Sequence, residues 1–277
     1  MSGLSNGSSR NLSINKDFFI NLLLFIWLLI IAFLAWADVF INHYEWIDSG
    51  PIQRLVSISK DDGLPNWFSS VQLFCVSMVL WSIFVVESYS KPVIENKRVF
   101  KYGWSFCAMF FSYLAIDDGS KMHERVGTTA RVLLESKHKS DPNFITKLFD
   151  VFPSYGWQFV YVPIFGVVAL LLLFFLYKKL KEKKQFIFII LGFGCFAGSV
   201  FLDFFEDMDA SVYDPVVNFF NTELYNIEHF SRLIEEILEM IGNTFFMLAF
   251  TKQLISYSNQ WNIHFYSKVN KVEDEKD

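Results

Sequence analysis

Six apolar runs constrain this chain more than any other feature of its sequence. They cover residues 18–37, 67–86, 102–116, 157–177, 185–205 and 227–255, and most approach the roughly 20 apolar residues that a helix needs to cross a bilayer. The composition agrees, because 53% of the 277 residues are hydrophobic and only 19% are charged. We therefore expect an all-α polytopic integral membrane bundle with about six transmembrane helices. The composition argues against a soluble fold.

The runs divide the chain into a membrane domain and two polar ends. We expect a disordered cytoplasmic tail at 1–16, a six-span domain at 17–258 and a charged cytoplasmic tail at 259–277. Ala35-Trp36-Ala37 has the pattern of a signal-peptidase site, but the apolar run before it is longer than the roughly 7–15 residues of a signal peptide. We expect a retained helix. Short interfacial helices are expected on the outer side, at 51–58 and 126–134, and an aromatic-containing piece follows at 144–152.

The basic loops predict the orientation. Lysines crowd the short connections at 91–101 and 178–184 and recur from Lys252 onward, and such residues accumulate on the cytoplasmic side. Both termini are then cytoplasmic, in a multi-pass protein of the inner (plasma) membrane. The Lys and Arg residues form no single basic face, so the sequence indicates no nucleic-acid partner.

The stretch Ala115 to Gly127 carries ionisable residues at or near membrane depth, where they are costly and usually functional. Counting ~1.5 Å of helix rise per residue from the nearest cytoplasmic lysine puts Asp117 at ~24 Å, Asp203 at ~28 Å, Glu235 at ~26 Å and Glu239 at ~20 Å. Four carboxylates from three helices thus share one layer of the outer leaflet. A second tier at ~33–35 Å contains Asp38, His123, Glu124, Glu206 and His229.

Carboxylates this close cannot all stay ionised without countercharge. They must take up protons, pair with Lys121, Arg125 or Arg232, or bind a metal. We predict a divalent metal site whose identity is left open between zinc, iron, manganese and calcium. A metal-bound water would need a general base, for which we predict Glu124 or Asp118. The predicted metal ligands are Asp117, His123, Asp203, Glu235 and Glu239.

Two motifs carry a resemblance to known proteins. Asp117-Asp118-x4-His123-Glu124 at the end of one span, and Glu235-Glu236-Ile-Leu-Glu239-Met240-Ile-Gly242 inside the last, resemble elements of a group of poorly characterised bacterial six-span membrane proteins. This resemblance implies a six-span core. The acidic and His residues at helix ends are more loosely similar to the alkaline ceramidase-like membrane hydrolases, which implies hydrolytic chemistry at a metal.

Three functions remain open on the sequence alone. The first is a metal-dependent membrane hydrolase acting on a lipid-like substrate from the outer leaflet. The second is an ion- or proton-conducting or ion-sensing membrane protein that loads a cation on the same carboxylates. The third is a structural or assembly subunit whose acidic cluster is an ion-pair network. Membrane lipid is the expected partner, and a homo-oligomer or a cytoplasmic protein partner is compatible with the charged C-terminal tail.

Overall fold

The computed structural model describes residues 15–60, 62–89, 97–140 and 143–257, so almost all of the two predicted tails lies outside the described residues. The described part is helical and contains no strand, which confirms the all-α class. Its elements are α1 (Lys16–Asp38), the π-helical turn η1 (Val39–His43), α2 (Gly50–Val56), α3 (Leu64–Tyr89), α4 (Lys97–Ser120), α5 (Met122–Ser140), α6 (Phe144–Asp150), α7 (Gly156–Leu180), α8 (Phe186–Glu206), the 3₁₀ turn η2 (Ala210–Tyr213), α9 (Asp214–Phe220) and α10 (Leu224–Ile255).

Four of the described helices are long and apolar enough to cross a membrane: α1 with its extension η1, α3, α7 and α8. Large apolar side chains cover their outer faces, for example Phe25 and Phe33 on α1 and Leu170 and Phe174 on α7. Such faces cost nothing in hydrocarbon, whereas a soluble protein rarely exposes apolar patches of this extent. The chain therefore has the character of a membrane protein.

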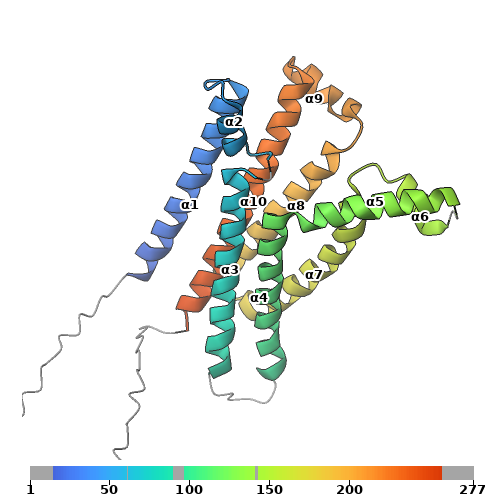
Figure 1. The fold of residues 1–277 in the computed structure, drawn as a ribbon. Coiled ribbons are helices and arrows are strands. Elements are labelled where there is room, and N and C mark those ends of the chain that lie inside the picture. Colours follow the sequence, from blue (N-terminus) through green and yellow to red (C-terminus); the bar gives the residue numbers. More distant parts are fainter. Residues whose placement is uncertain (1–14, 61, 90–96, 141–142, 258–277) are drawn as a thin grey trace, which may run out of the picture.

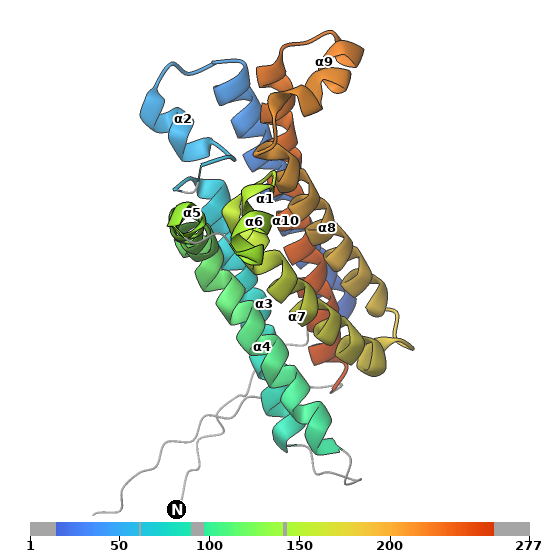
Figure 2. The ribbon, with the colours of Figure 1, turned by 90° about the vertical axis from the view of Figure 1, so that its right-hand side faces the viewer.

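Helix α10 runs through the middle of the bundle (Figures 1 and 2), and it contacts α1, α3 and α8. Helices α3 and α4 form an antiparallel pair on one side of it, α8 lies along another side, and α7 leans against α8 and α4. The enclosed position of α10 explains how a helix with three glutamates within five residues, Glu235, Glu236 and Glu239, belongs to this bundle, because its neighbours shield most of it.

The hydrophobic core fills the half of the bundle that lies away from α2 and α9. It is made by α3, α4, α7, α8 and α10, which contribute Leu73, Val76, Leu80, Ile83, Trp104, Cys107, Ala108, Phe111, Leu172, Leu176, Leu180, Ile189, Phe246, Ala249 and Phe250. A second cluster joins α1 to α10 through Ile31, Leu34, Leu233 and Met240. The opposite half of the bundle holds the ionisable residues.

Glycines let α8 and α10 approach closely. A Cβ on Gly192 would lie 2.9 Å from the ring of Phe246, and one on Gly242 would lie 2.8 Å from the ring of Phe196. Gly198 also faces α10, through Leu238, whereas Gly194 has open space around it. Small residues at a helix interface are typical of membrane bundles, where association depends on close packing.

Buried polar side chains join α3 to α10. The Gln72 amide donates to Thr244 Oγ1 at 3.2 Å, and the Asn243 amide donates to Ser69 Oγ at 3.3 Å. All four side chains are almost inaccessible. Hydrogen bonds of this kind fix the register of two helices in an apolar medium.

A sharp corner ends α4. Lys121 has φ 51°, in the left-handed region, and it separates α4 from α5. Because L side chains rarely adopt this conformation, the helix cannot continue straight through it. Helix α5 leaves the bundle at a steep angle and carries α6 alongside it (Figure 1). The short helix predicted at 51–58 corresponds to α2, and the one predicted at 126–134 is part of the longer α5. Helix α6 lies in the segment that was expected only to be rich in aromatic residues. The interfacial position of these helices stays a prediction.

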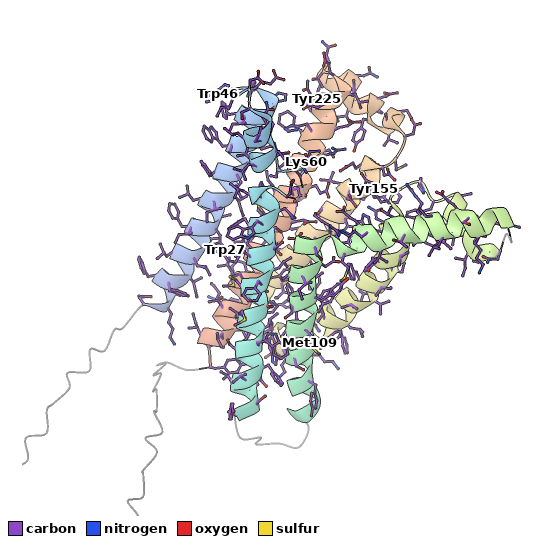
Figure 3. The ribbon with its side chains drawn as sticks, in the orientation of Figure 1. Trp27, Trp46, Lys60, Met109, Tyr155 and Tyr225 are labelled. Carbon is purple, nitrogen blue, oxygen red and sulfur yellow. The ribbon has the colours of Figure 1, made fainter. Side chains whose placement is uncertain are left out.

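Exposed aromatic residues mark the end of the bundle that carries α2 and α9. Trp46 and Tyr225 are labelled there in Figure 3, and more than half of each side chain is accessible. Tryptophan and tyrosine collect where a membrane meets water.

Candidate functional site

A cavity of about 920 Å³ lies among α4, α5, α7, α8 and α10, and it is called the outer cavity below. Its wall has two kinds of lining. Ionisable side chains come from the ends of α4 and α8, from α5 and from the middle of α10, and apolar side chains come from the helix segments nearer the core. The ionisable set is Asp117, Asp118, Lys121, His123, Glu124, Arg131, Asp203, Glu206, Arg232, Glu235, Glu236 and Glu239.

This convergence is the one that the depth count predicts. Asp117, Asp203, Glu235 and Glu239 all reach the outer cavity although they lie on three helices far apart in sequence. The five residues expected at ~33–35 Å do not all reach this cavity. His123, Glu124 and Glu206 line it, whereas Asp38 and His229 do not.

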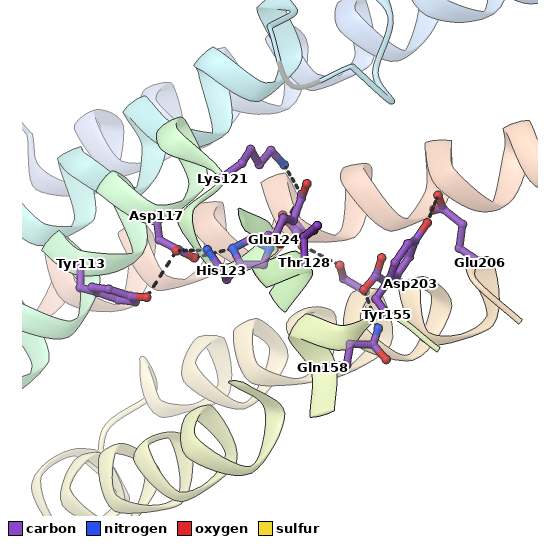
Figure 4. Close-up of polar contacts among 12 residues, drawn as sticks. Tyr113, Asp117, Lys121, His123, Glu124, Thr128, Tyr155, Gln158, Asp203 and Glu206 are labelled. Atoms are coloured by element: carbon purple, nitrogen blue, oxygen red, sulfur yellow. Dashed lines mark hydrogen bonds and ion pairs between the residues drawn. The ribbon is translucent and has the colours of Figure 1, made fainter. Parts of the chain in front are cut away.

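Asp117 and His123 form a close pair at the corner between α4 and α5 (Figure 4). The His123 Nδ1 lies 2.6 Å from Asp117 Oδ2, and the His123 backbone N–H donates to Asp117 Oδ1 at 2.9 Å. Tyr113 also donates to Oδ1, at 3.3 Å. Both oxygens of Asp117 are thus engaged, and the residue is only 3% exposed.

The surroundings of His123 hold its ring and favour its charge. The ring packs edge-on against Trp157, with centroids 4.8 Å apart. Burial opposes protonation, but the hydrogen bond to Asp117 and the negative charge of that carboxylate outweigh it and raise the pKa of His123 above its ordinary value. Its second ring nitrogen, Nε2, lies 3.9 Å from Glu124 Oε1.

Lys121 lies among carboxylates. Its Nζ is 3.6 Å from Glu124 Oε1. Figure 4 marks this ion pair with a dashed line. Burial disfavours the ammonium, but the charges of Glu236, Asp118, Glu239 and Glu124 outweigh this and raise the pKa of Lys121. One ammonium is therefore in the field of four carboxylates.

Three carboxyl groups from two helices form a compact group, the carboxylate triad of Asp203, Glu206 and Glu235. One oxygen from each lies within 4.8 Å of the others. Oxygens bound to one Ca²⁺ at about 2.3–2.6 Å can be up to about 5 Å apart, so the triad fits a single divalent cation. Asp203 and Glu206 are three residues apart on α8, which brings them to one face of that helix.

Neighbouring polar groups hold the triad in place. Gln158 Nε2 donates to Asp203 Oδ2 at 2.5 Å. Tyr155 donates to Glu206 Oε1 at 2.9 Å, and Arg232 Nη2 lies 2.9 Å from the same oxygen. Burial and then the adjacent Glu206 charge raise the pKa of Tyr155, which keeps its hydroxyl protonated as a donor. Arg232 offsets one of the three negative charges.

The other predicted site residues have separate partners. Asp118 accepts a hydrogen bond from Ser70 at 2.6 Å, and Glu239 accepts one from Ser199 at 2.8 Å. Among the described residues, Asp117, His123 and Glu239 are not members of the triad. Their assignment as metal ligands stays a prediction. Arg125, considered above as a counter-ion, does not line the outer cavity, whereas Arg232 and Lys121 do.

Close packing between α5 and α7 fixes the position of the corner residues. A Cβ on Gly127 would lie 2.3 Å from the backbone nitrogen of Trp157, and one on Gly156 would lie 2.8 Å from the carbonyl oxygen of Gly127. The two backbones touch here, and His123, one turn before Gly127, is thereby held against Trp157.

Asp38 and His229 form a second polar centre outside the cavity. Asp38 is fully buried, and its Oδ2 lies 3.1 Å from His229 Nε2. Its other oxygen accepts from Asn42 at 2.9 Å and from the backbone N–H of Ile58 at 3.0 Å. This centre ties α1 and the segment after α2 to α10, so its geometry is that of a structural link.

The sequence undervalued Glu206 and did not identify Gln158, Ser70 or Ser199. The signal for Glu206 was present, because it follows Asp203 by three residues on one helix face. Gln158, Ser70 and Ser199 lie 40 or more residues from the carboxyl groups that they contact. Only the packing of different helices reveals them.

A family model with the description "Domain of unknown function (DUF8692)" matches residues 22–254. No curated protein and no solved structure matches the chain.

Proposed function

The chain belongs to the family of Domain of unknown function (DUF8692), and from the site of this member we propose a membrane-embedded hydrolase that uses a divalent metal and acts on a lipid-like substrate. The observation that carries the proposal is the carboxylate triad on the wall of a cavity that is ionisable at one end and apolar at the other.

The proposal includes six spans, with α4 and α10 added to the four apolar helices. The 24 residues of α4 and the 32 of α10 give lengths of about 36 Å and about 48 Å, which exceed the hydrocarbon thickness of about 30 Å. Helix α4 exposes Phe106, Met109 and Ile116, as a lipid-facing helix does. Helix α10 is shielded by its neighbours, so its glutamates face protein and the cavity.

The proposed orientation keeps the lysine-rich end of the bundle in the cytoplasm. Lys178, Lys179 and Lys181 lie at the end of α7 opposite to the outer cavity, and lysines favour the cytoplasmic side. The cavity then opens in the outer leaflet of the inner membrane, with both termini inside. A substrate would reach it from that leaflet.

The triad would hold the metal. A set of oxygen ligands suits calcium or manganese better than zinc, which usually takes His or Cys. When bound, such a cation would lower the pKa of a water molecule and polarise the bond to be hydrolysed. Gln158 and Tyr155 orient two of the ligands through their hydrogen bonds.

Proton transfer would fall to Glu124 and His123. Glu124 is the more accessible of the two predicted bases, with a side chain 43% exposed and 3.9 Å from His123 Nε2. Asp118 is held by Ser70. Asp117 then acts through His123, since its hydrogen bond fixes Nδ1 and directs Nε2 away from itself. This pairing of a carboxylate with a histidine is a common way to set the ring's orientation.

The proposal is tested by incubating the purified protein in detergent with a polar lipid extract and with ester- and amide-linked lipid probes. Released products are identified by mass spectrometry before and after chelation and metal return. We expect metal-dependent release of a fatty acid or head group, lost in Glu124→Gln and His123→Ala. Glu182→Gln, on the exposed loop after α7, is the matched control and should keep activity. No product with any metal would refute the hydrolase.

A further inference from the structure

We propose that the outer cavity binds an amphiphile with one hydrocarbon chain and a cationic amine head. This proposal adds to the proposed function the chemical class of the substrate or product. Only the statement that the amphiphile is a substrate or product rests on the proposed hydrolase. Binding of the amine requires the cavity and its charges.

The apolar end of the outer cavity has the lining expected around a chain. It is formed by Phe110 and Leu114 of α4, Phe165 and Ala169 of α7, and Phe193 and Ala197 of α8. The volume of about 920 Å³ is at the upper end of the range for small-molecule sites. A chain there points toward the core, so its head must lie among the ionisable side chains.

The charge of the ionisable end selects a cation. Among the described residues that line the cavity, eight have carboxyl groups and four are basic. The basic groups are already paired: His123 with Asp117, Arg232 with Glu206, Arg131 with Asp207, and Lys121 with Glu124. An anionic head would therefore meet surplus negative charge, whereas an ammonium would reduce it.

Two carboxylates have acceptor capacity for the head. In the described part of the chain, Asp118 accepts from Ser70 and Glu239 accepts from Ser199, and a carboxylate can accept about four hydrogen bonds. A primary ammonium offers three donors. Lys121 shows that this region already holds one ammonium, because its Nζ lies 3.6 Å from Glu124 Oε1 on the wall of the same cavity.

The carboxylate triad does not supply these contacts, so a metal and an amine can be held together. The triad consists of Asp203, Glu206 and Glu235, and the amine partners are Asp118 and Glu239. Trp157 lines the same end of the cavity and presents an aromatic ring, which attracts a nearby cation.

The test compares head groups on one chain, because a hydrocarbon tail gains little on moving from bilayer to cavity. Radiolabelled dodecylamine, dodecanol and dodecyl sulfate are equilibrated with phosphatidylcholine nanodiscs that contain the protein and with empty nanodiscs. We expect saturable uptake of dodecylamine above the empty discs, and no saturable uptake of the other two. Equal uptake by loaded and empty discs, or equal binding of dodecanol, would overturn the proposal.

Variants separate head from chain. Asp118→Asn with Glu239→Gln should weaken dodecylamine binding by at least about tenfold, which corresponds to about 1.4 kcal/mol. Ala197→Phe should fill the apolar end and abolish binding, whereas Val167→Phe on the lipid-facing side of α7 is the matched control. Thermal unfolding checks that each variant is folded, and unaltered binding in the folded double variant would contradict the assignment.

Chelation distinguishes this proposal from the hydrolase. Dodecylamine binding that persists in EDTA supports the amine site even where no metal or turnover is found, so the hydrolase can fail alone. Binding that appears only after metal removal would show that amine and metal compete for one set of carboxylates, which overturns the separate amine site.

Discussion

Replacing Asp117 by Asn should destabilise the corner between α4 and α5 in a pH-dependent way. Asp117 accepts from His123 twice, at 2.6 Å and 2.9 Å, and from Tyr113 at 3.3 Å. An amide of the same shape keeps one acceptor oxygen but presents an NH₂ group where the second oxygen stood. One hydrogen bond to a charged group is lost, at a cost of roughly 1.5–3 kcal/mol.

The sign of the pH dependence follows from the raised pKa of His123. A group whose pKa is raised by folding contributes its full stability below the unfolded-state pKa, about 6.5 for His. That contribution is lost as the pH rises through the folded-state pKa. The difference in unfolding temperature between the wild type and Asp117→Asn should thus be largest at acidic pH and should become smaller above neutral pH.

The assay is thermal unfolding in detergent, followed by tryptophan fluorescence from about pH 5 to about pH 9, which brackets the ordinary His pKa. Asp62→Asn, which removes an exposed ion pair with Arg54, is the control and should follow the wild type closely. A difference in unfolding temperature that stays constant over this pH range would show that Asp117 acts by packing. No difference at all would refute a contribution of the Asp117–His123 pair to stability.

Two further predictions concern the bundle and its orientation. Gly127→Ala should lower the free energy of unfolding by about 1–3 kcal/mol, because the new Cβ would overlap the backbone of Trp157. The control Gly166→Ala has open space around the new Cβ and should be neutral or stabilising. Equal unfolding temperatures for the two variants would contradict the close approach of Gly127 to Trp157. In a variant without native cysteines, Lys147→Cys should react with an impermeant maleimide in intact cells and Lys181→Cys only after permeabilisation, and the reverse pattern would invert the orientation.

The helical architecture follows from the sequence because bilayer thickness fixes the length of an apolar run and helix rise fixes depth. Counting from lysines thus brings Asp117, Asp203, Glu235 and Glu239 to one cavity without any tertiary information. The third run was expected to end near residue 116, but α4 continues to Ser120. Polar residues do not by themselves end a helix, and the left-handed Lys121 does.

The roles of individual carboxyl groups could not be predicted, because they depend on side-chain direction. Asp117 and Glu206 lie at similar places in their helices, yet Asp117 turns toward His123 and Glu206 joins the triad. The turn at Lys121 brings His123 back over Asp117, and the close approach of Gly127 to Trp157 packs the start of α5 against α7. Neither feature has a period or spacing that a sequence pattern could reveal.

The most direct test of the account is the metal content of the purified protein, measured by elemental analysis after reloading with calcium, manganese or zinc. The account predicts stoichiometric metal in the wild type and in the control Glu182→Gln, on the exposed loop after α7, and loss of metal in Glu235→Gln. Both variants should remain folded, which thermal unfolding verifies. Metal retained in Glu235→Gln, or none bound by the wild type under any loading condition, would contradict a metal site at Asp203, Glu206 and Glu235.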